Sequence, residues 1–301
     1  MNDHELPELS VVIASPYSFD DLDQLLRSLD AQRHGRAVEI IVGNCCQEPA
    51  IEMLIARYSD VTFLRYARRT PLPELWGAGI ARSQGRIIAI TDSTCAIRPG
   101  WIEAILRAHQ SPHPVIGGAM EPTPLRSLLD WSVYFCEYGQ FMHPLKAGVA
   151  QELPGNNISF KREALGRGSE FAAPSFYKTY WCRHLQAEGV ALISDPSIVA
   201  GYRKSYRLIP FLIRRFHHGR CFAGMRNRQL HVLRRLIYAA GCGVLPFLFL
   251  SRIARAILPK RRFMKEFLLS TPHTILAVAS WSLGEFVGYL LGPANSCDLI
   301  Y

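Results

Sequence analysis

The chain has 301 residues, a net charge of +9 and 49% hydrophobic residues, enough for the cores of one large or two ordinary domains. The first residues are acidic and contain no apolar run, which argues against a signal peptide. The eight cysteines show no metal-type pairs. We therefore exclude a cysteine-based metal site and expect reduced cytosolic thiols.

The positive charge is concentrated in one part of the chain. Residues 203–265 contain sixteen Lys or Arg and no Asp or Glu, so this block carries +16 and the rest of the chain carries −7. A block of one sign favours an anionic partner, which can be phospholipid, a lipid phosphate or nucleic acid.

The first ninety residues alternate between apolar runs and amphipathic segments. Three buried strands are expected at 9–14, 38–42 and 61–66, and helices are expected at 20–32, 51–58 and 72–84. Strands that alternate with helices imply right-handed crossovers and a mainly parallel sheet.

The next strand leads directly to a single acid. Residues 87–90 form a continuous apolar run, typical of a strand that is covered on both faces, and Asp92 follows it. Open α/β sheets bind ligands at the carboxyl ends of their strands, so Asp92 is well placed to meet a ligand or its metal. The alternative is an Asp that caps a helix or forms a turn.

Four further elements are expected beyond this strand. They are a helix at 101–109, a strand at 115–118, an aromatic-rich helix at 125–139 and a short strand at 158–160. The aromatic cluster of the second helix is more typical of a core or an interface than of a sugar platform.

Five segments, in this order, resemble family 2 glycosyltransferases: 9–17, 39–42, 76–83, 92–101 and 155–162. The last one, Gly-Asn-Asn-Ile-Ser-Phe-Lys-Arg, is similar to the family's acceptor-side segment. The resemblance covers roughly residues 8–200. It implies an α/β GT-A fold, Rossmann-like, with a mainly parallel sheet and flanking helices, followed here by an apolar and basic helical region.

The resemblance implies a donor site at the strand ends. Ser15, Pro16 and Tyr17 correspond to positions that hold the nucleotide base, and Asn44 takes the place of the family's Asp. Asn can still hydrogen-bond a pyrimidine, although a turn-forming Asn is an equal alternative. Arg82 lies in the family's donor helix, where it would meet a phosphate oxygen unless it is an ordinary surface Arg.

The family's metal-binding Asp-x-Asp triplet reads Asp92-Ser93-Thr94 here, so one carboxylate remains. Mg²⁺ or Mn²⁺ can be held through one carboxylate together with phosphates and water, and the resemblance therefore still implies a divalent metal at Asp92. Gly155, Asn156 and Asn157 correspond to positions that face the sugar or the acceptor.

The family's catalytic base is an acid at the start of a late helix, and Lys178 stands in its place. A lysine can act as a base only if its pKa is strongly depressed, so we expect Lys178 to serve structure or to bind an acceptor phosphate. Glu170 is the fallback base, although a surface Glu is the more common interpretation.

The C-terminal third contains two apolar segments, at 236–250 and 274–291, with a basic stretch between them. Both are short for a bilayer span, and a spanning hairpin would place the basic stretch on the wrong side of the membrane. Interfacial helices or a re-entrant hairpin avoid that conflict. Buried helices of a soluble domain, or an interface with a protein partner, are the alternative.

Together these features predict a catalytic domain at 1–202 and a membrane-associating region at 203–301. The first functional hypothesis is an inverting enzyme, peripheral or monotopic at the cytoplasmic face of the cell membrane. It would move a sugar from a nucleotide diphosphate donor, UDP-linked, to a lipid-linked or polysaccharide acceptor. The second is a catalytically degenerate scaffold of a polysaccharide-assembly complex. Nucleic-acid binding is disfavoured, because apolar helices interrupt the basic block.

Overall fold

A computed structural model describes residues 6–16, 18–167, 174–227 and 230–299. The chain forms two compact units. The first comprises Met1–Thr123 and Phe141–Arg203, and the second comprises Pro124–Gln140 and Lys204–Tyr301. Residues 124–140 thus belong with the C-terminal helices, whereas the division expected after residue 202 had placed them in the first region.

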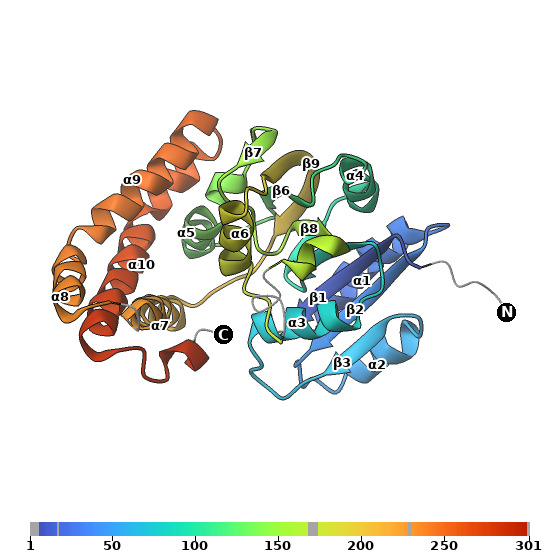
Figure 1. Ribbon diagram of the computed structural model, residues 1–301, viewed down its shortest axis with the longest axis horizontal. Helices are drawn as coiled ribbons and strands as arrows, with labels where there is room; N and C mark the ends of the chain where they lie inside the picture. Colours follow the sequence, from blue (N-terminus) through green and yellow to red (C-terminus); the bar gives the residue numbers. More distant parts are fainter. Residues whose placement is uncertain (1–5, 17, 168–173, 228–229, 300–301) are drawn as a thin grey trace. The chain divides into compact units, whose positions relative to one another are not determined.

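The first unit is built on a nine-stranded sheet with the order β3-β2-β1-β4-β8-β6-β9-β5, and β7 pairs with β9 (Figure 1). The strands are β1 (Leu9–Ser15), β2 (Val38–Asn44), β3 (Thr62–Arg65), β4 (Ile87–Asp92), β5 (Cys95–Ile97), β6 (Val115–Pro122), β7 (Gly148–Ala150), β8 (Ile158–Lys161) and β9 (Leu192–Tyr202). The helices are α1 (Phe19–Arg33), α2 (Ile51–Arg57), α3 (Leu72–Arg82), α4 (Trp101–Ala108) and α6 (Lys178–Ala187). The predicted α/β fold is confirmed.

The strands β3, β2, β1 and β4 are parallel, and β8 then runs antiparallel between β4 and β6. Buried Val, Ile and Leu on both faces of β1 and β4 explain why these strands lie at the centre. In the register, Ser15 pairs with Asn44, and Ala14 pairs with Asp92. The carboxyl ends of three adjacent strands therefore meet at one edge of the sheet.

The strand β9 has eleven residues, and it is not among the strands expected from the sequence. It runs parallel to β6 and antiparallel to β5 and β7, and its register with β6 shifts between Gly117 and Ala119. Pro196 and polar residues interrupt its apolar pattern, which is the reason that periodicity does not reveal it.

The second unit consists of α5 (Leu128–Glu137), α7 (Leu208–Asn227), α8 (Val232–Gly241), α9 (Leu245–Ile257) and α10 (Met264–Leu291). The long helix α10 contacts the other four. Against α7 it packs backbone to backbone: a Cβ on Gly284 would lie 2.0 Å from the Phe216 carbonyl oxygen, and one on Gly219 would lie 2.1 Å from that of Trp281. Only glycine permits this approach.

The helix α5 belongs to the second unit through aromatic and polar contacts with α10 and the turn before it. Trp131 packs on Phe263, and Phe135 packs edge-on against Phe267. The Thr274 hydroxyl also bonds to that of Ser132 at 3.1 Å. The aromatic cluster expected in this helix is therefore part of a helical core.

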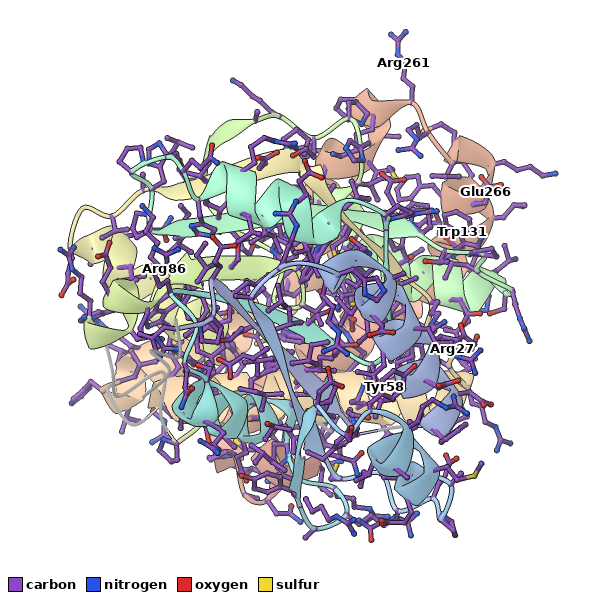
Figure 2. All side chains as sticks on the ribbon, turned by 90° about the vertical axis from the view of Figure 1, so that its right-hand side faces the viewer. Arg27, Tyr58, Arg86, Trp131, Arg261 and Glu266 are labelled. Atoms are coloured by element: carbon purple, nitrogen blue, oxygen red, sulfur yellow. A yellow bond between two sulfur atoms is a disulfide. The ribbon has the colours of Figure 1, made fainter. Side chains whose placement is uncertain are left out.

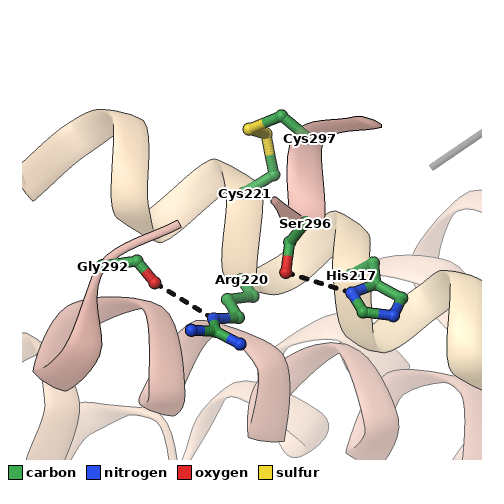
Figure 3. Close-up of a disulfide and its surroundings, with 6 residues drawn as sticks. All are labelled: His217, Arg220, Cys221, Gly292, Ser296 and Cys297. Carbon is green, nitrogen blue, oxygen red and sulfur yellow. Dashed lines mark hydrogen bonds between the residues drawn. A yellow bond between two sulfur atoms is a disulfide. The ribbon is translucent and has the colours of Figure 1, made fainter. Parts of the chain in front are cut away.

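A disulfide joins Cys221 in α7 to Cys297 near the C-terminal end of the second unit (Figure 3). Arg220 Nε donates to the Gly292 carbonyl oxygen at 3.0 Å, and His217 Nδ1 lies 3.0 Å from Ser296 Oγ. The expectation of reduced cysteines throughout is thus wrong for this pair. The pairing brings together residues 76 positions apart, which no local pattern could indicate. The other six cysteines are free.

Among the described residues, α10 is the single helix long and apolar enough to cross a membrane. A second candidate is the pair formed by α8 and the segment Leu245–Lys260, which is bent by 61°. The helix α10 begins at Met264, ten residues before the expected apolar segment, so it reaches 28 residues. In the turn before α10, the exposed Arg261 projects into the solvent (Figure 2).

Candidate functional site

The candidate site lies at the carboxyl ends of β1, β2 and β4. Ser15, Asn44 and Asp92 are the last residues of these strands, and all three are buried. The backbone continues the strand pairing beyond them, because Ser93 N donates to the Ala14 carbonyl and Cys45 N donates to the Ser15 carbonyl. This edge is where open α/β sheets hold ligands.

The Asp92 carboxylate is held by two neighbours. Its Oδ1 accepts the backbone N–H of Thr94 at 2.8 Å together with the Thr94 hydroxyl, and its Oδ2 accepts the Asn156 amide at 3.0 Å. Asp92 is 6% exposed. A carboxylate offers about four lone-pair positions, so these three bonds leave room for one further ligand on Oδ2.

Two serine hydroxyls next to Asp92 are buried without a partner. The Oγ atoms of Ser15 and Ser93 make no hydrogen bond within the described parts of the chain, and both residues are fully buried. An unsatisfied buried hydroxyl costs roughly 1–3 kcal/mol. The edge therefore presents polar groups that a bound polar ligand would satisfy.

Asn44 is engaged locally. Its amide donates to the Cys46 carbonyl at 3.1 Å, and its oxygen accepts from Cys46 N at 3.3 Å. These are the contacts of a turn-forming Asn, the alternative given for this residue. Tyr17, the third residue expected at the nucleotide base, lies outside the described residues.

The helix α3 places Trp76 and the candidate Arg82 at opposite ends of β4. Trp76 donates its indole N–H to the Thr91 carbonyl at 2.7 Å, beside Asp92. Arg82 is the last residue of α3, and the chain then enters the start of β4 at Ile87. Because Arg82 lies at the strand end opposite to Asp92, its expected phosphate contact is not supported, and we leave it out of the site.

The two asparagines of the Gly-Asn-Asn segment make different contacts, one at the candidate site and the other within the fold. Asn156 holds Asp92, whereas the Asn157 side chain is used in three structural bonds: to the carbonyls of Ala119 and Ile198 and from the Trp101 indole. Asn157 is 1% exposed, and its expected position facing the sugar or the acceptor stays a prediction. Gly155 has open space where a side chain would be, with only the Lys178 Cε atom 3.7 Å from an added Cβ.

Lys178 is the first residue of α6. Its Nζ donates to the Leu153 carbonyl at 2.8 Å and lies 3.7 Å from a Glu152 carboxylate oxygen. A lysine ammonium has three donors and no acceptor, so in these contacts it donates and does not accept a proton. Glu170, the other expected base, lies in a segment that the structure does not describe.

Two side chains at this edge were missed in the sequence. Glu152 stands outside the recognised segments, and only the fold brings it to Lys178. Arg203 follows β9, where Tyr202 pairs with Cys95, and its guanidinium donates to the Asp21 carbonyl at 2.9 Å. Arg203 was counted as the start of the basic block. Its place in the first unit depends on β9, which sequence patterns did not reveal.

A divalent metal fits this site only with help from a ligand. Nowhere in the described segments do three His, Cys, Asp or Glu side chains gather as a metal-binding group. One carboxylate together with phosphate and water oxygens is nevertheless a common way to bind Mg²⁺. Asp92 Oδ2, with its remaining lone-pair position, suits this arrangement.

The family model for glycosyl transferase family 2 matches residues 10–165, more than half of the chain. The chain belongs to this family. The matched segment thus contains the strand ends with Ser15, Asn44 and Asp92, and the turn with Asn156. Comparison with curated proteins gives no match.

Among solved structures, this glycosyltransferase is similar to the mannosyltransferase PcManGT from Pyrobaculum calidifontis in complex with GDP-Man and Mn2+. The TM-score is 0.57 and the identity 15%, over 96% of this chain and 88% of that one. GalNAc-T7 with UDP, GalNAc and Mn2+ matches at a TM-score of 0.47 and 14% identity, over 68% of this chain and 44% of that one. At such identities the first match shows the shared fold alone.

Proposed function

We propose that the protein transfers a sugar from a nucleotide diphosphate donor to a lipid-linked or polysaccharide acceptor, with inversion at the anomeric carbon. The observation that supports this most is the donor edge itself. A buried carboxylate with one free position lies beside two unpartnered buried hydroxyls, at the strand ends of a family 2 domain.

Each residue of the edge has a role in this proposal. Ser15, Pro16, Tyr17 and Asn44 would hold the nucleotide base, and Asp92 would bind a divalent metal through Oδ2. When bound, Mn²⁺ or Mg²⁺ would stabilise the negative charge of the leaving diphosphate. Asn156 fixes the orientation of the Asp92 carboxylate through its 3.0 Å bond. A UDP-linked donor is expected, and the GDP-Man in the mannosyltransferase named above adds GDP to the donors to test.

The chemistry is a direct displacement. The acceptor hydroxyl oxygen forms a bond to the anomeric carbon as the bond from that carbon to the diphosphate oxygen breaks. The hydroxyl proton passes to a base, and the nucleoside diphosphate leaves with the electron pair. Attack from the face opposite to the leaving group inverts the anomeric configuration.

A second proposal is a catalytically degenerate subunit that scaffolds a membrane polysaccharide-assembly complex. Two observations favour it: Thr94 replaces the second carboxylate of the triplet, and Lys178 replaces the acid that would serve as base. Both residues are used in internal contacts, with Asp92 and with Leu153 respectively.

Calorimetric titration of the full chain with UDP, GDP, CDP and ADP, with and without Mn²⁺, distinguishes the two. We expect one nucleotide to bind and its affinity to rise with Mn²⁺. Absence of heat across the whole panel would contradict the enzyme and favour the scaffold.

We further propose that the second unit associates with an anionic membrane surface, as a peripheral or monotopic protein. Large apolar side chains are exposed on α8, α9 and α10, for example Leu233 (64%), Phe247 (72%) and Leu291 (74%) respectively. Lys260, Arg261 and Arg262 form a basic turn before α10, and this turn lies within the same unit. The cytoplasmic side was inferred from reduced cysteines, and the Cys221–Cys297 disulfide removes that argument.

A further inference from the structure

An acid outside the segments that resemble the family lies close in space to Lys178, the first residue of α6. Glu152 follows β7 and precedes Gly155 by three residues. One of its carboxylate oxygens lies 3.7 Å from Lys178 Nζ, and the same ammonium donates to the Leu153 carbonyl at 2.8 Å. The lysine thus ties together the segment before Gly155 and the first turn of α6.

Two independent contacts join the chain segments on either side of this pair to the donor edge. On one side, Asn156, four residues after Glu152, bonds to Asp92. On the other side, Phe176 N donates to the Pro73 carbonyl at 2.7 Å, which fixes the approach to α6 against α3. That helix in turn bonds to the end of β4 through Trp76.

The two carboxylates of this region differ in accessibility. Asp92 is almost fully buried and held on both oxygens, whereas the Glu152 side chain is 38% exposed. A hydroxyl that arrives from solvent can therefore reach Glu152 more readily than Asp92. Among the described residues, only the Lys178 Cε atom lies within 4 Å of a Cβ added at Gly155, at 3.7 Å.

The pair is also more than an isolated surface contact. Burial raises the pKa of the Cys182 thiol, one turn further along α6, to about 11. The charge of Lys178 lowers this pKa, and the charge of Glu152 raises it. An exposed ion pair by itself contributes roughly 0–1 kcal/mol to stability. A carboxylate anchored by a lysine that a backbone carbonyl also holds has a defined position, which a proton acceptor needs.

We propose that Glu152 is the general base of this transferase and that Lys178 is the residue that positions it. The inference rests on the proposed glycosyl transfer. The carboxylate takes the proton of the attacking hydroxyl as its oxygen bonds to the anomeric carbon and the diphosphate departs with its electron pair. The acid missing from the start of α6 is thus supplied by the segment that precedes the Gly-Asn-Asn motif.

The test uses the full chain and water as the acceptor, because a base that activates a sugar hydroxyl also activates water. Release of UDP from UDP-glucose and of GDP from GDP-mannose is measured across pH, and binding of UDP and GDP is measured by calorimetry. We expect Glu152→Gln to lower the release rate at least about 100-fold, with the nucleotide dissociation constant within about twofold of wild type.

Three further variants separate chemistry from structure. Glu188→Gln removes a similarly exposed acid, at the C-terminal cap of α6, that pairs with His184, and this variant should release nucleotide like wild type. Lys178→Met should lower the rate with nucleotide binding retained, and Lys178→Arg should restore most of it, since an Arg can hold the same carboxylate. The rise of rate with pH should be present in wild type and absent in Glu152→Gln.

The outcomes separate the inference from the proposed function. Nucleotide release by Glu152→Gln at the wild-type rate overturns the role of Glu152 and leaves the transferase standing. Equal losses of release and of nucleotide binding also overturn it, because they indicate a structural role. A wild-type protein that neither binds nor releases a nucleotide overturns the proposed function and the inference with it.

Discussion

At the scale of single residues, Asp92 combines two tasks, since it closes a turn with Thr94 and offers an oxygen to a ligand. Asp92→Asn keeps the shape but leaves one acceptor where the carboxylate has two, so Thr94 or Asn156 must face an amide N–H. We expect a loss of about 1–3 kcal/mol in unfolding free energy, with the fold retained. Calorimetry should show no Mn²⁺-dependent gain in nucleotide affinity.

Asp195 provides the matched control for this variant. It also accepts the backbone N–H and hydroxyl of the residue two positions on, Ser197, at 2.8 and 2.7 Å, but it lies in an exposed segment. Asp195→Asn should leave the Mn²⁺ effect unchanged. If Asp92→Asn also keeps that effect, Asp92 is not the metal ligand.

His109 gives the first unit a dependence on pH. It is buried with Nε2 at 2.9 Å from Ser159 Oγ, and burial, aided by Lys161, lowers its pKa from 6.5 to about 4. Between these values the unfolded chain binds a proton that the folded chain does not. Its contribution to stability is therefore complete above pH 6.5 and is lost as the pH falls toward 4, by on the order of 3 kcal/mol.

Replacing His109 tests whether its protonation makes the stability of the protein depend on pH. His109→Gln should be less stable than wild type at pH 7.5, because its side chain does not fill the site of the ring. At pH 4.5 the difference should shrink by roughly 2 kcal/mol, as measured by urea unfolding at both values. A difference that stays constant with pH would show that His109 does not titrate on unfolding.

The sequence predicted Asp92 at the donor edge because a strand pattern and a family segment coincide there. It could not separate Asn156 from Asn157, since adjacent residues of one motif point to different partners only once β6, β9 and α4 are in place. Glu152 was beyond reach for a similar reason. Its partner lies 26 positions away in the chain, in a helix that family comparison had associated with acids.

At the scale of elements, the contact between α7 and α10 depends on glycine. Gly284→Ala would place a Cβ 2.0 Å from the Phe216 carbonyl, so the helices must separate. We expect a loss of about 1–3 kcal/mol in stability, although alanine is the better helix former. Gly241→Ala, at the end of α8 with nothing within 4 Å, should be neutral or slightly stabilising.

Thermal unfolding followed by circular dichroism compares the two variants. Equal melting temperatures would mean that α7 and α10 do not approach as closely as described. The apolar composition of residues 274–291 indicated a helix, but the close approach of two backbones became visible only when Gly219 and Gly284 met across the interface.

At the scale of the whole molecule, membrane attachment can be tested without removing an element. Truncation before residue 207 would uncover Trp131 and Phe135, which pack on Phe263 and Phe267, and so could cause aggregation. Replacing Lys260, Arg261 and Arg262 with Gln leaves the helices intact. At about 1 kcal/mol for each basic residue, binding to vesicles that contain anionic lipid should weaken on the order of 100-fold.

The control is a second triple variant that loses the same three positive charges from the first unit. Arg65, Arg86 and Arg107 are three of the exposed arginines of the first unit, and replacing these three with Gln should change vesicle binding little. Flotation of both triple variants with vesicles measures the effect. Equal binding by the two would indicate that net charge, rather than the basic turn, attracts the protein.

The disulfide has a consequence for the integrity of the chain. Because a disulfide joins Cys221 to Cys297, 76 positions further along, a single proteolytic cut anywhere between them leaves two fragments that are still one covalent molecule. The basic turn with Arg261 lies inside this loop and is exposed to proteases. A nicked protein should therefore keep its full mass on a gel without reductant and separate into two bands only when reductant is added.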